Sequence, residues 1–284
     1  MPSPTVNSPT RRVNHPPALP PRPIDGQKGL FGRVLIVGGN PEMIGAPAFA
    51  AAAALRTGSG LLQIALPESV LAAALTVIPE AIGLALGPNA DLSKLIEAGG
   101  HANVIVVGPG LGQSPIVSRR IDALLQLGKP MVVDADALNY LSKVKHWPEF
   151  SAVLTPHPGE MKRLTGQTVP TDDAGRIDLA THTARRLKKI ILLKGHRTVV
   201  TDGHRVYINK TGDSSLSKAG AGDVLSGIVA SLIGQKMELF QAACLAAHLH
   251  GRAGEIAGKK LGRRCVLARD VVDSIHLALG EGRP

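Results

Sequence analysis

Aromatic residues and cysteines are scarce in this chain. Only 2% of its 284 residues are aromatic, four Phe, two Tyr and one Trp. Because single-stranded nucleic acids bind by stacking their bases on aromatic rings, so few scattered rings predict no nucleic-acid partner. The two cysteines, Cys244 and Cys265, match neither a metal-ligand spacing nor a disulfide framework. We expect both to be inert thiols.

Long hydrophobic runs are also missing. The longest apolar run, from Ala46 to Leu55, is too short to span a bilayer. No cationic segment followed by an apolar core stands at the N-terminus, so no targeting segment is predicted. These features predict a cytoplasmic protein with no membrane partner. With 44% hydrophobic residues, the chain has enough apolar surface for one large core.

Positive charge predominates, with a formal net charge of +10. Two basic clusters, 185–189 and 259–264, have the pattern of solvated helix faces. A small polyphosphate ligand would also be attracted by a positive field.

The first 28 residues differ in composition from the rest. They contain eight prolines and no apolar periodicity. This composition is typical of a flexible or extended leader, which we expect to be dispensable for catalysis. We place the single folded domain at residues 29–284.

From Arg33 onward, short β-branched runs alternate with helical stretches. The candidate strands are 34–37, 61–66, 104–107, 131–134, 152–154 and 190–193. The clearest candidate helices are 46–56, 223–233, 238–257 and 269–279. Such alternation predicts a three-layer α/β/α sandwich with a mostly parallel sheet. Residues 198–201 and 206–208 are expected to form a hairpin at one edge. Ligands of such folds bind at the carboxyl ends of the strands.

The most informative motif is the run from Lys218 to Gly227. Gly220, Ala221 and Gly222 precede an apolar helix, so their N–H groups are expected to form an anion hole at its N-terminus. Asp223 would project beside a phosphate held there, where it could take a proton from a hydroxyl. The alternative is a glycine turn in which Asp223 merely caps the helix.

Glycines and acids cluster at other predicted strand ends. Gly110 and Gly112 follow the strand at 104–107, and Ala46 opens an alanine-rich helix whose small side chains allow close approach. Asp134 and Asp136 follow the strand at 131–133. These acids could hold Mg²⁺ through water, or one could cap the next helix, for which Asp136 is the better candidate.

Two further segments carry candidate chemistry. His157 lies between two prolines, and Glu160 follows at the start of the next predicted helix. Rigid backbone on both sides of a histidine suggests a fixed partner. At 194–198, Lys194 is a candidate phosphate ligand, with a solvated turn as the alternative.

Together these motifs resemble those of the ADP- or ATP-dependent NAD(P)H-hydrate dehydratases, which have a ribokinase-like fold. The shared motifs are Gly-Pro-Gly-Leu-Gly at 108–112, Asp-Ala-Asp-Ala-Leu-Asn at 134–139, Thr-Pro-His-Pro-Gly-Glu at 155–160, Leu-Lys-Gly at 193–195, Gly-Ala-Gly-Asp at 220–223 and His-Gly at 250–251. The chain departs from many members at Asn40, at Met43 and at 213–217. The resemblance covers most of the chain from Val34 to Gly254.

The resemblance implies repair of hydrated NADH or NADPH at the expense of ADP or ATP, with Mg²⁺. Asp223 would be the base, and Gly220, Ala221 and Gly222 would hold the transferred phosphoryl group. The resemblance places the hydrated dinucleotide against Ala46, Gly110, Gly112, His157 and Asp223. It places ADP or ATP against Lys194, Gly195, His196, Arg197, Thr198 and Gly222. Glu160 would organise Mg²⁺, directly or through water.

It also implies a homo-oligomer, by family a tetramer, that works with a separate NAD(P)H-hydrate epimerase. Two other functions stay open at this point. One is a small-molecule kinase for a sugar or vitamin precursor. The other is a nucleotide-binding protein without catalysis, although the intact Asp223 argues against it.

Overall fold

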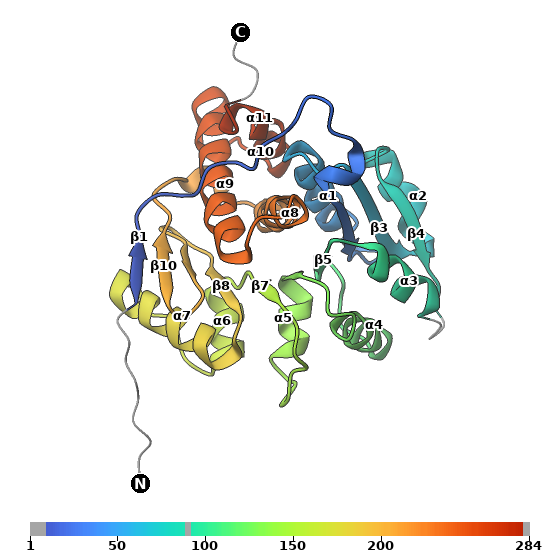
Figure 1. The fold of residues 1–284 in the computed structure, drawn as a ribbon, viewed down its shortest axis with the longest axis horizontal. Helices are drawn as coiled ribbons and strands as arrows, with labels where there is room; N and C mark the ends of the chain where they lie inside the picture. Colours follow the sequence, from blue (N-terminus) through green and yellow to red (C-terminus); the bar gives the residue numbers. More distant parts are fainter. Residues whose placement is uncertain (1–9, 89–91, 281–284) are drawn as a thin grey trace.

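A ten-stranded sheet runs through the protein, with helices on both faces (Figure 1). The computed structural model describes residues 10–88 and 92–280. The strand order is β1-β10-β9-β8-β7-β6-β5-β2-β3-β4. Of these strands, only β9 runs antiparallel to its neighbours. The strands are β1 (Arg11–Val13), β2 (Arg33–Val37), β3 (Leu61–Pro67), β4 (Ile82–Leu86), β5 (Val104–Val107), β6 (Met131–Val133), β7 (Ala152–Leu154), β8 (Ile190–Leu193), β9 (Val199–Thr201) and β10 (Arg205–Ile208).

Two hydrophobic cores, one on each face of the sheet, hold the helices in place. Successive residues of β2 point to opposite faces, so Val34 and Ile36 belong to one core and Leu35 and Val37 to the other. The first face is covered by α1 (Gly45–Arg56), α2 (Glu68–Val77), α8 (Ala221–Gly234), α9 (Leu239–Leu261), α10 (Ala268–Asp273) and α11 (Ile275–Ala278). The second is covered by α3 (Ser93–His101), α4 (Pro115–Leu125), α5 (Ala135–Leu141), α6 (Pro158–Thr165) and α7 (Asp173–Leu187). The predicted three-layer α/β sandwich is confirmed.

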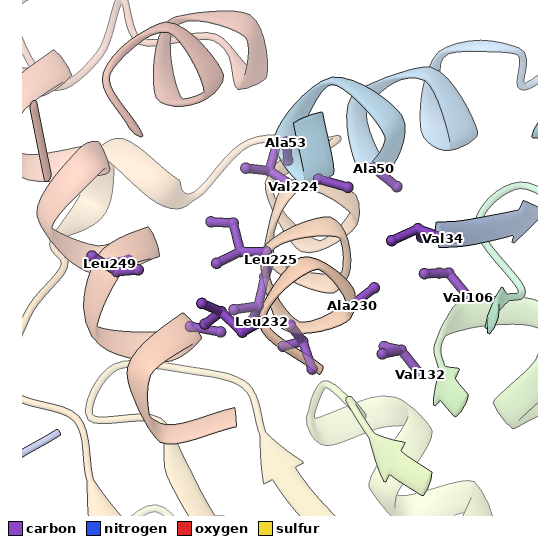
Figure 2. Packing of buried hydrophobic residues seen from close by; sticks show 14 of the residues in the cluster. Val34, Ala50, Ala53, Val106, Val132, Val224, Leu225, Ala230, Leu232 and Leu249 are labelled. Atoms are coloured by element: carbon purple, nitrogen blue, oxygen red, sulfur yellow. The ribbon is translucent and has the colours of Figure 1, made fainter. Parts of the chain in front are cut away.

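Helix α8 is the most deeply buried helix of the first layer. Figure 2 shows its apolar side chains between α1, α9 and the strands, with Leu225 and Leu232 facing Leu249. A methyl group at Gly227 would overlap the backbone carbonyl of Ala50, so glycine is needed where α1 crosses α8. This packing fixes the position of the α8 N-terminus.

Part of the N-terminal segment is an extended strand. β1 pairs in parallel with β10, in register Arg11 with Arg205, so this part of the leader is extended and docked on the sheet. The sequence did not predict β1 because its three residues, two of them arginines, show no apolar alternation. A strand at the edge of a sheet can pair through its backbone alone. Further along, the Arg22 guanidinium stacks on the Phe31 ring and donates a hydrogen bond to the Gly58 carbonyl. Residues 1–9 lie outside the described residues, and the domain boundary near residue 29 stays a prediction.

Three other details differ from the sequence prediction. The β9–β10 hairpin is present, but β1 covers β10, so the hairpin does not form the sheet edge. Strand β4 was not predicted; it contains a glycine, which disfavours a strand, and its first residue, Ile82, is exposed in the structure. The helix expected over 269–279 is two short helices that meet at Ser274. Across the described residues, no helix has both the length and the apolar character needed to cross a membrane.

Candidate functional site

The carboxyl ends of five parallel strands, β2, β5, β6, β7 and β8, lie at one edge of the sheet. Every strand-end motif singled out in the sequence follows one of these strands. The anion-hole motif joins them because Ser226, on α8, donates a hydrogen bond of 2.7 Å to Asp134 Oδ2 at the end of β6. The α8 N-terminus is thereby tied to the strand ends.

Lys194 is the central cation of the site. Its Nζ lies 2.8 Å from Asp134 Oδ1 and 3.8 Å from Glu160 Oε2. The Asp134 and Glu160 side chains are only 2% and 5% exposed, so both carboxylates depend on this ammonium group for charge balance. Burial alone would lower the pKa of Lys194, but the charges of Asp134 and Glu160 raise it above its usual value. Lys194 is therefore a permanent cation.

Asp134 also caps the helix that follows it. Its Oδ1 accepts a hydrogen bond from the Ala135 N–H, and Ala135 has a positive φ of 47°. The sequence favoured Asp136 as the cap, and this assignment is wrong. Asp136 instead accepts the Gly112 N–H through Oδ2, at 2.8 Å, which fixes the glycine loop after β5. The helix starts at Ala135, two residues earlier than a cap at Asp136 would require, so the capping acid is the first of the pair.

Asp223 lies in the first turn of α8, three residues after the N-cap Gly220. The φ of 88° at Gly220 favours glycine there. Within the described chain, its carboxylate makes no hydrogen bond, and Gly220, with no side-chain cap, occupies the N-cap position. Burial, together with the nearby charge of Asp134, raises the pKa of Asp223 to about 7, against the opposing effect of Lys194. The geometry thus does not support the capping alternative, and the carboxyl group titrates near neutral pH.

His157 and Glu160 form a capping box at the start of α6. The His157 Nδ1 accepts the Gly159 N–H at 2.9 Å, and Glu160 Oε2 accepts the His157 N–H at 2.8 Å. Burial and the charges of Lys194 and Arg163 lower the pKa of His157, whereas burial raises that of Glu160. A neutral, half-exposed imidazole is therefore held by its own backbone turn, with its Nε2 edge 3.4 Å from Glu160 Oε1.

The structure also brings Ala46 and Gly110 together. A side chain at Gly110, where φ is 60°, would contact both Met43 and the Ala46 methyl group. Asn40 Nδ2 donates a hydrogen bond of 3.0 Å to the Gly110 carbonyl. Asn40 and Met43, two positions where the chain departs from its relatives, therefore line the same corner as two predicted site residues.

A cavity of about 410 Å³ opens between the end of β8 and helices α8 and α9. Its walls include the five predicted residues of the 194–198 segment, and Gly222. A Cβ atom at Gly222 would lie 3.3 Å from Lys194 Nζ, so the ammonium group faces the anion hole directly. The other predicted group, Ala46, Gly110, Gly112 and His157, lies outside this cavity.

Sequence reasoning missed Arg176, which holds one wall of this cavity. Its buried guanidinium donates hydrogen bonds to the carbonyls of His196 and Arg197, at 2.5 and 3.3 Å. Arg197 has a φ of 56° and pairs with Asp173 at 2.7 Å. Arg176 lies 20 residues before His196 in the sequence, so no local sequence pattern reveals this contact.

The described residues contain no group of three or more His, Cys, Asp or Glu side chains placed to hold a metal ion. The oxygens of Asp134 and one oxygen of Glu160 already accept hydrogen bonds from the protein. These carboxylates suit a cation that keeps its own water and takes its remaining ligands from a phosphate, as Mg²⁺ does.

The mostly parallel sheet and its two helix layers match the fold of a ribokinase-like superfamily protein from Enterococcus faecalis, with a TM-score of 0.79 at 25% identity over 92% of this chain and 91% of its own. The hydroxyethylthiazole kinase protein from Pyrococcus horikoshii shares this fold, with a TM-score of 0.57 at 18% identity over 81% of this chain and 93% of its own. Residues 34–277 match the profile of the NAD(P)H-hydrate dehydratases, and the chain belongs to that family.

Two similar proteins agree with this assignment. The bifunctional NAD(P)H-hydrate repair enzyme of Moorella thermoacetica is 43% identical over 275 residues, which cover 92% of this chain and 52% of that enzyme. The ADP/ATP-dependent NAD(P)H-hydrate dehydratase of Bacillus subtilis, co-crystallised with ATP and Mg²⁺, has a TM-score of 0.80 at 30% identity, covering 93% of this chain and 94% of its own. This chain spans about half the length of the curated relatives it matches.

Proposed function

We propose that the protein dehydrates hydrated NADH or NADPH, using ADP or ATP as phosphoryl donor. The observation that carries this proposal is Asp223, a carboxyl group with a pKa of about 7 beside the amides of Gly220 to Gly222 and the Lys194 ammonium group. A general base works best when its pKa lies near the operating pH. Family membership supplies the substrate class.

In the first step, the hydroxyl oxygen of the hydrated nicotinamide attacks the terminal phosphorus of the nucleotide. Asp223 takes the hydroxyl proton, a P–O bond forms to the substrate, and the bond to the leaving ADP or AMP breaks. The amides of the anion hole stabilise the charge on the transferred phosphoryl group.

In the second step, the ring nitrogen donates its electron pair and the C–O bond breaks, releasing inorganic phosphate. Loss of a proton from the neighbouring ring carbon restores the dihydropyridine. Phosphorylation is needed because hydroxide is a poor leaving group. The net reaction converts the hydrate and ADP or ATP to NAD(P)H, inorganic phosphate and AMP or ADP.

The two substrates are assigned to different parts of the site. The nucleotide would occupy the cavity of about 410 Å³, against Lys194 to Thr198 and Gly222. The hydrated dinucleotide would lie against Ala46, Gly110, Gly112 and His157, with Asp223 between the two. Glu160 would hold Mg²⁺ through water, and the ion would neutralise charge on the phosphates. The assignment of individual residues to the nucleotide, the dinucleotide or Mg²⁺ rests on the family motifs.

We further propose that the protein is a homo-oligomer in the cytoplasm. The resemblance to the NAD(P)H-hydrate dehydratases supports this proposal, together with a functional partnership with a separate NAD(P)H-hydrate epimerase, which would supply the correct stereoisomer of the hydrate.

The deciding experiment is recovery of NADH from purified hydrate, followed by the absorbance of the reduced nicotinamide. Recovery with ADP or ATP plus Mg²⁺, and none without nucleotide, would support the dehydratase. Accumulation of a stable phosphate ester of a sugar or vitamin precursor, with no recovery of NADH, would replace it with the kinase alternative. Nucleotide binding with neither reaction would indicate a non-catalytic protein.

A further inference from the structure

The turn that joins β8 to β9 has an unusual backbone conformation. Its residues, 194–198, all line the cavity of about 410 Å³. Gly195 has a φ of 142° and Arg197 a φ of 56°, and residues with a side chain seldom adopt such positive values. A non-glycine residue in this region costs free energy, so contacts from the rest of the protein have to hold the turn in place.

The two ends of the turn are anchored in the sheet. The Lys194 N–H donates a hydrogen bond to the Pro156 carbonyl, and the Thr198 carbonyl accepts one from the Asn209 N–H, both at 2.9 Å. These bonds fix where the turn begins and ends. They do not reach its two middle residues, one of which has the strained backbone.

Arg176, near the start of α7, holds those middle residues. Its Nη1 atom donates hydrogen bonds to the carbonyls of His196 and Arg197, at 2.5 and 3.3 Å. A Cβ atom at Gly195 would lie 3.0 Å from Arg176 Nη2, so the guanidinium lies directly against the turn. Bonds from a charged donor are stronger than neutral ones, so this contact is well suited to hold a strained segment.

The position of Arg176 is costly for stability. The residue is only 8% exposed, and no carboxylate of the described chain forms an ion pair with it. The nearby acid, Asp173, is paired with Arg197 instead, at 2.7 Å. A buried cation that pairs only with neutral carbonyls destabilises the fold more than an apolar side chain of similar size would. The contact therefore calls for a gain other than stability.

Helix α7 is a rigid support for the turn. Asp172 caps its N-terminus by accepting the Gly175 N–H at 2.8 Å, and its buried side chains belong to the second core. The helix thus contacts the turn twice from a fixed position, through Arg176 and through the pair of Asp173 with Arg197. Both contacts exist without any ligand.

We infer that Arg176 is a positioning residue, which holds the turn at 195–198 in its nucleotide-binding conformation before the nucleotide arrives. This inference rests on the proposed binding of ADP or ATP in the cavity. When only a fraction of the molecules has the binding conformation, the apparent affinity falls in proportion to that fraction. Loss of Arg176 should therefore weaken nucleotide binding and leave the chemical step at Asp223 unchanged.

The test is calorimetric titration of full-length Arg176→Met with ADP and with ATP. Methionine replaces the apolar stem of the side chain and donates no hydrogen bond. A non-glycine residue in the left-handed region is disfavoured by a factor of about 5 to 30, so we expect the nucleotide to bind about 5- to 30-fold more weakly. The affinity for the hydrated dinucleotide should not change.

Steady-state kinetics separate positioning from a loss of folded protein. If Arg176 positions the turn, the KM for the nucleotide rises and kcat at saturating nucleotide is retained. If Arg176 only stabilises the fold, fewer molecules are active, so kcat and the calorimetric stoichiometry fall while KM stays the same. Arg176→Lys keeps the charge without the fork of donors, so it should restore part of the nucleotide affinity.

Arg186→Met is the matched control. Arg186 is an exposed residue of the same helix that donates a hydrogen bond of 3.1 Å to the Leu164 carbonyl, outside the cavity, so this variant should keep the parent affinity. If Arg176→Met does not fold, Arg176→Lys and Asp173→Asn decide the matter. Asp173 is 39% exposed, and its replacement releases Arg197 from the other contact with α7, so nucleotide binding should weaken by a smaller factor.

Parent affinity for ADP and ATP in a folded Arg176→Met protein would overturn the inference. Equal weakening of nucleotide and dinucleotide, or a lower kcat with an unchanged KM, would do the same. The nucleotide titrations need no hydrated dinucleotide, so a protein that shows the Arg176 effect but restores no NADH would refute the proposed reaction alone. A parent protein that binds neither ADP nor ATP would overturn the inference together with the proposed nucleotide site.

Discussion

Replacing Asp223 with asparagine should abolish turnover while both ligands still bind. The substitution keeps the size of the side chain and removes the group that accepts the proton. A positioned general base contributes a factor of about 10² to 10⁴, so we expect a rate loss in that range. Because the Asp223 carboxylate makes no hydrogen bond within residues 10–88 and 92–280, the variant should unfold no more readily than the parent.

The raised pKa adds a dependence on pH. With a pKa of about 7, roughly a tenth of Asp223 is ionised at about pH 6 and nine tenths at about pH 8. The value of kcat/KM should therefore rise about tenfold across this range and then level off. The effect of pH on stability has the opposite sign to its effect on the rate. Between the unfolded and folded pKa values the native state binds more protons, so this group's contribution to the free energy of unfolding falls as pH rises.

The assay is recovery of NADH absorbance with saturating ADP or ATP, in parallel with calorimetric titration of each ligand. Asp178→Asn, an exposed carboxylate on α7, is the matched control and should leave the rate unchanged. A rate for Asp223→Asn within about threefold of the parent would be far too high for loss of a general base, and the reasoning would be refuted.

Three other changes test the rest of the architecture. Lys194→Ala should weaken ADP binding more than dinucleotide binding in calorimetric titrations. It should also lower the free energy of unfolding by about 3–5 kcal/mol in urea, because Asp134 then stays buried without its partner. Gly227→Ala should cost about 1–3 kcal/mol in urea denaturation, since the added methyl overlaps the backbone of α1. Deletion of residues 1–13 should lower Tm by exposing the edge of β10 and leave the rate of NADH recovery unchanged.

Each of these three has an outcome that would contradict it. Unchanged ADP affinity in Lys194→Ala would remove that residue from the nucleotide side. Gly234→Ala is the control for Gly227→Ala, because a methyl group there meets its nearest neighbour at an ordinary 3.6 Å. Equal stabilities of the two variants would contradict the account of the helix crossing. A truncated protein that folds but is inactive would give the N-terminal segment a role in catalysis.

The central strands could be predicted because their residues are apolar on both faces. β5, β7 and β8 have the predicted bounds, since each is a short β-branched or aliphatic run with polar or glycine residues at its ends. Buried parallel strands carry this signal strongly. β1 and β4 lie at the two edges of the sheet. β1 has two arginines and no apolar run, and β4 is apolar but contains Gly83, which is unfavourable within a strand.

The site could be predicted only where its residues are close in sequence. The glycines and the acid of the anion hole fall within four consecutive residues, and His157 and Glu160 of the α6 capping box are three residues apart. The pairing of Lys194 with Asp134 joins β8 to β6, and no local spacing encodes it. The same holds for Arg176 and for Ser226, whose polar contacts depend on how the layers pack. The choice between Asp134 and Asp136 as the cap depended on a positive φ at Ala135, which L-residues seldom adopt.

The pairing of β1 with β10 has a consequence for how the chain folds. The two strands are far apart in the sequence, Arg11 beside Arg205. During synthesis, β1 leaves the ribosome long before its partner exists, and the entropy of closing so long a loop has to be offset by contacts made first. β1 can therefore dock only after β10 has been made and placed in the sheet. Until then β10 exposes unpaired backbone groups, so the interval before docking is when the nascent chain is most open to association with other strands.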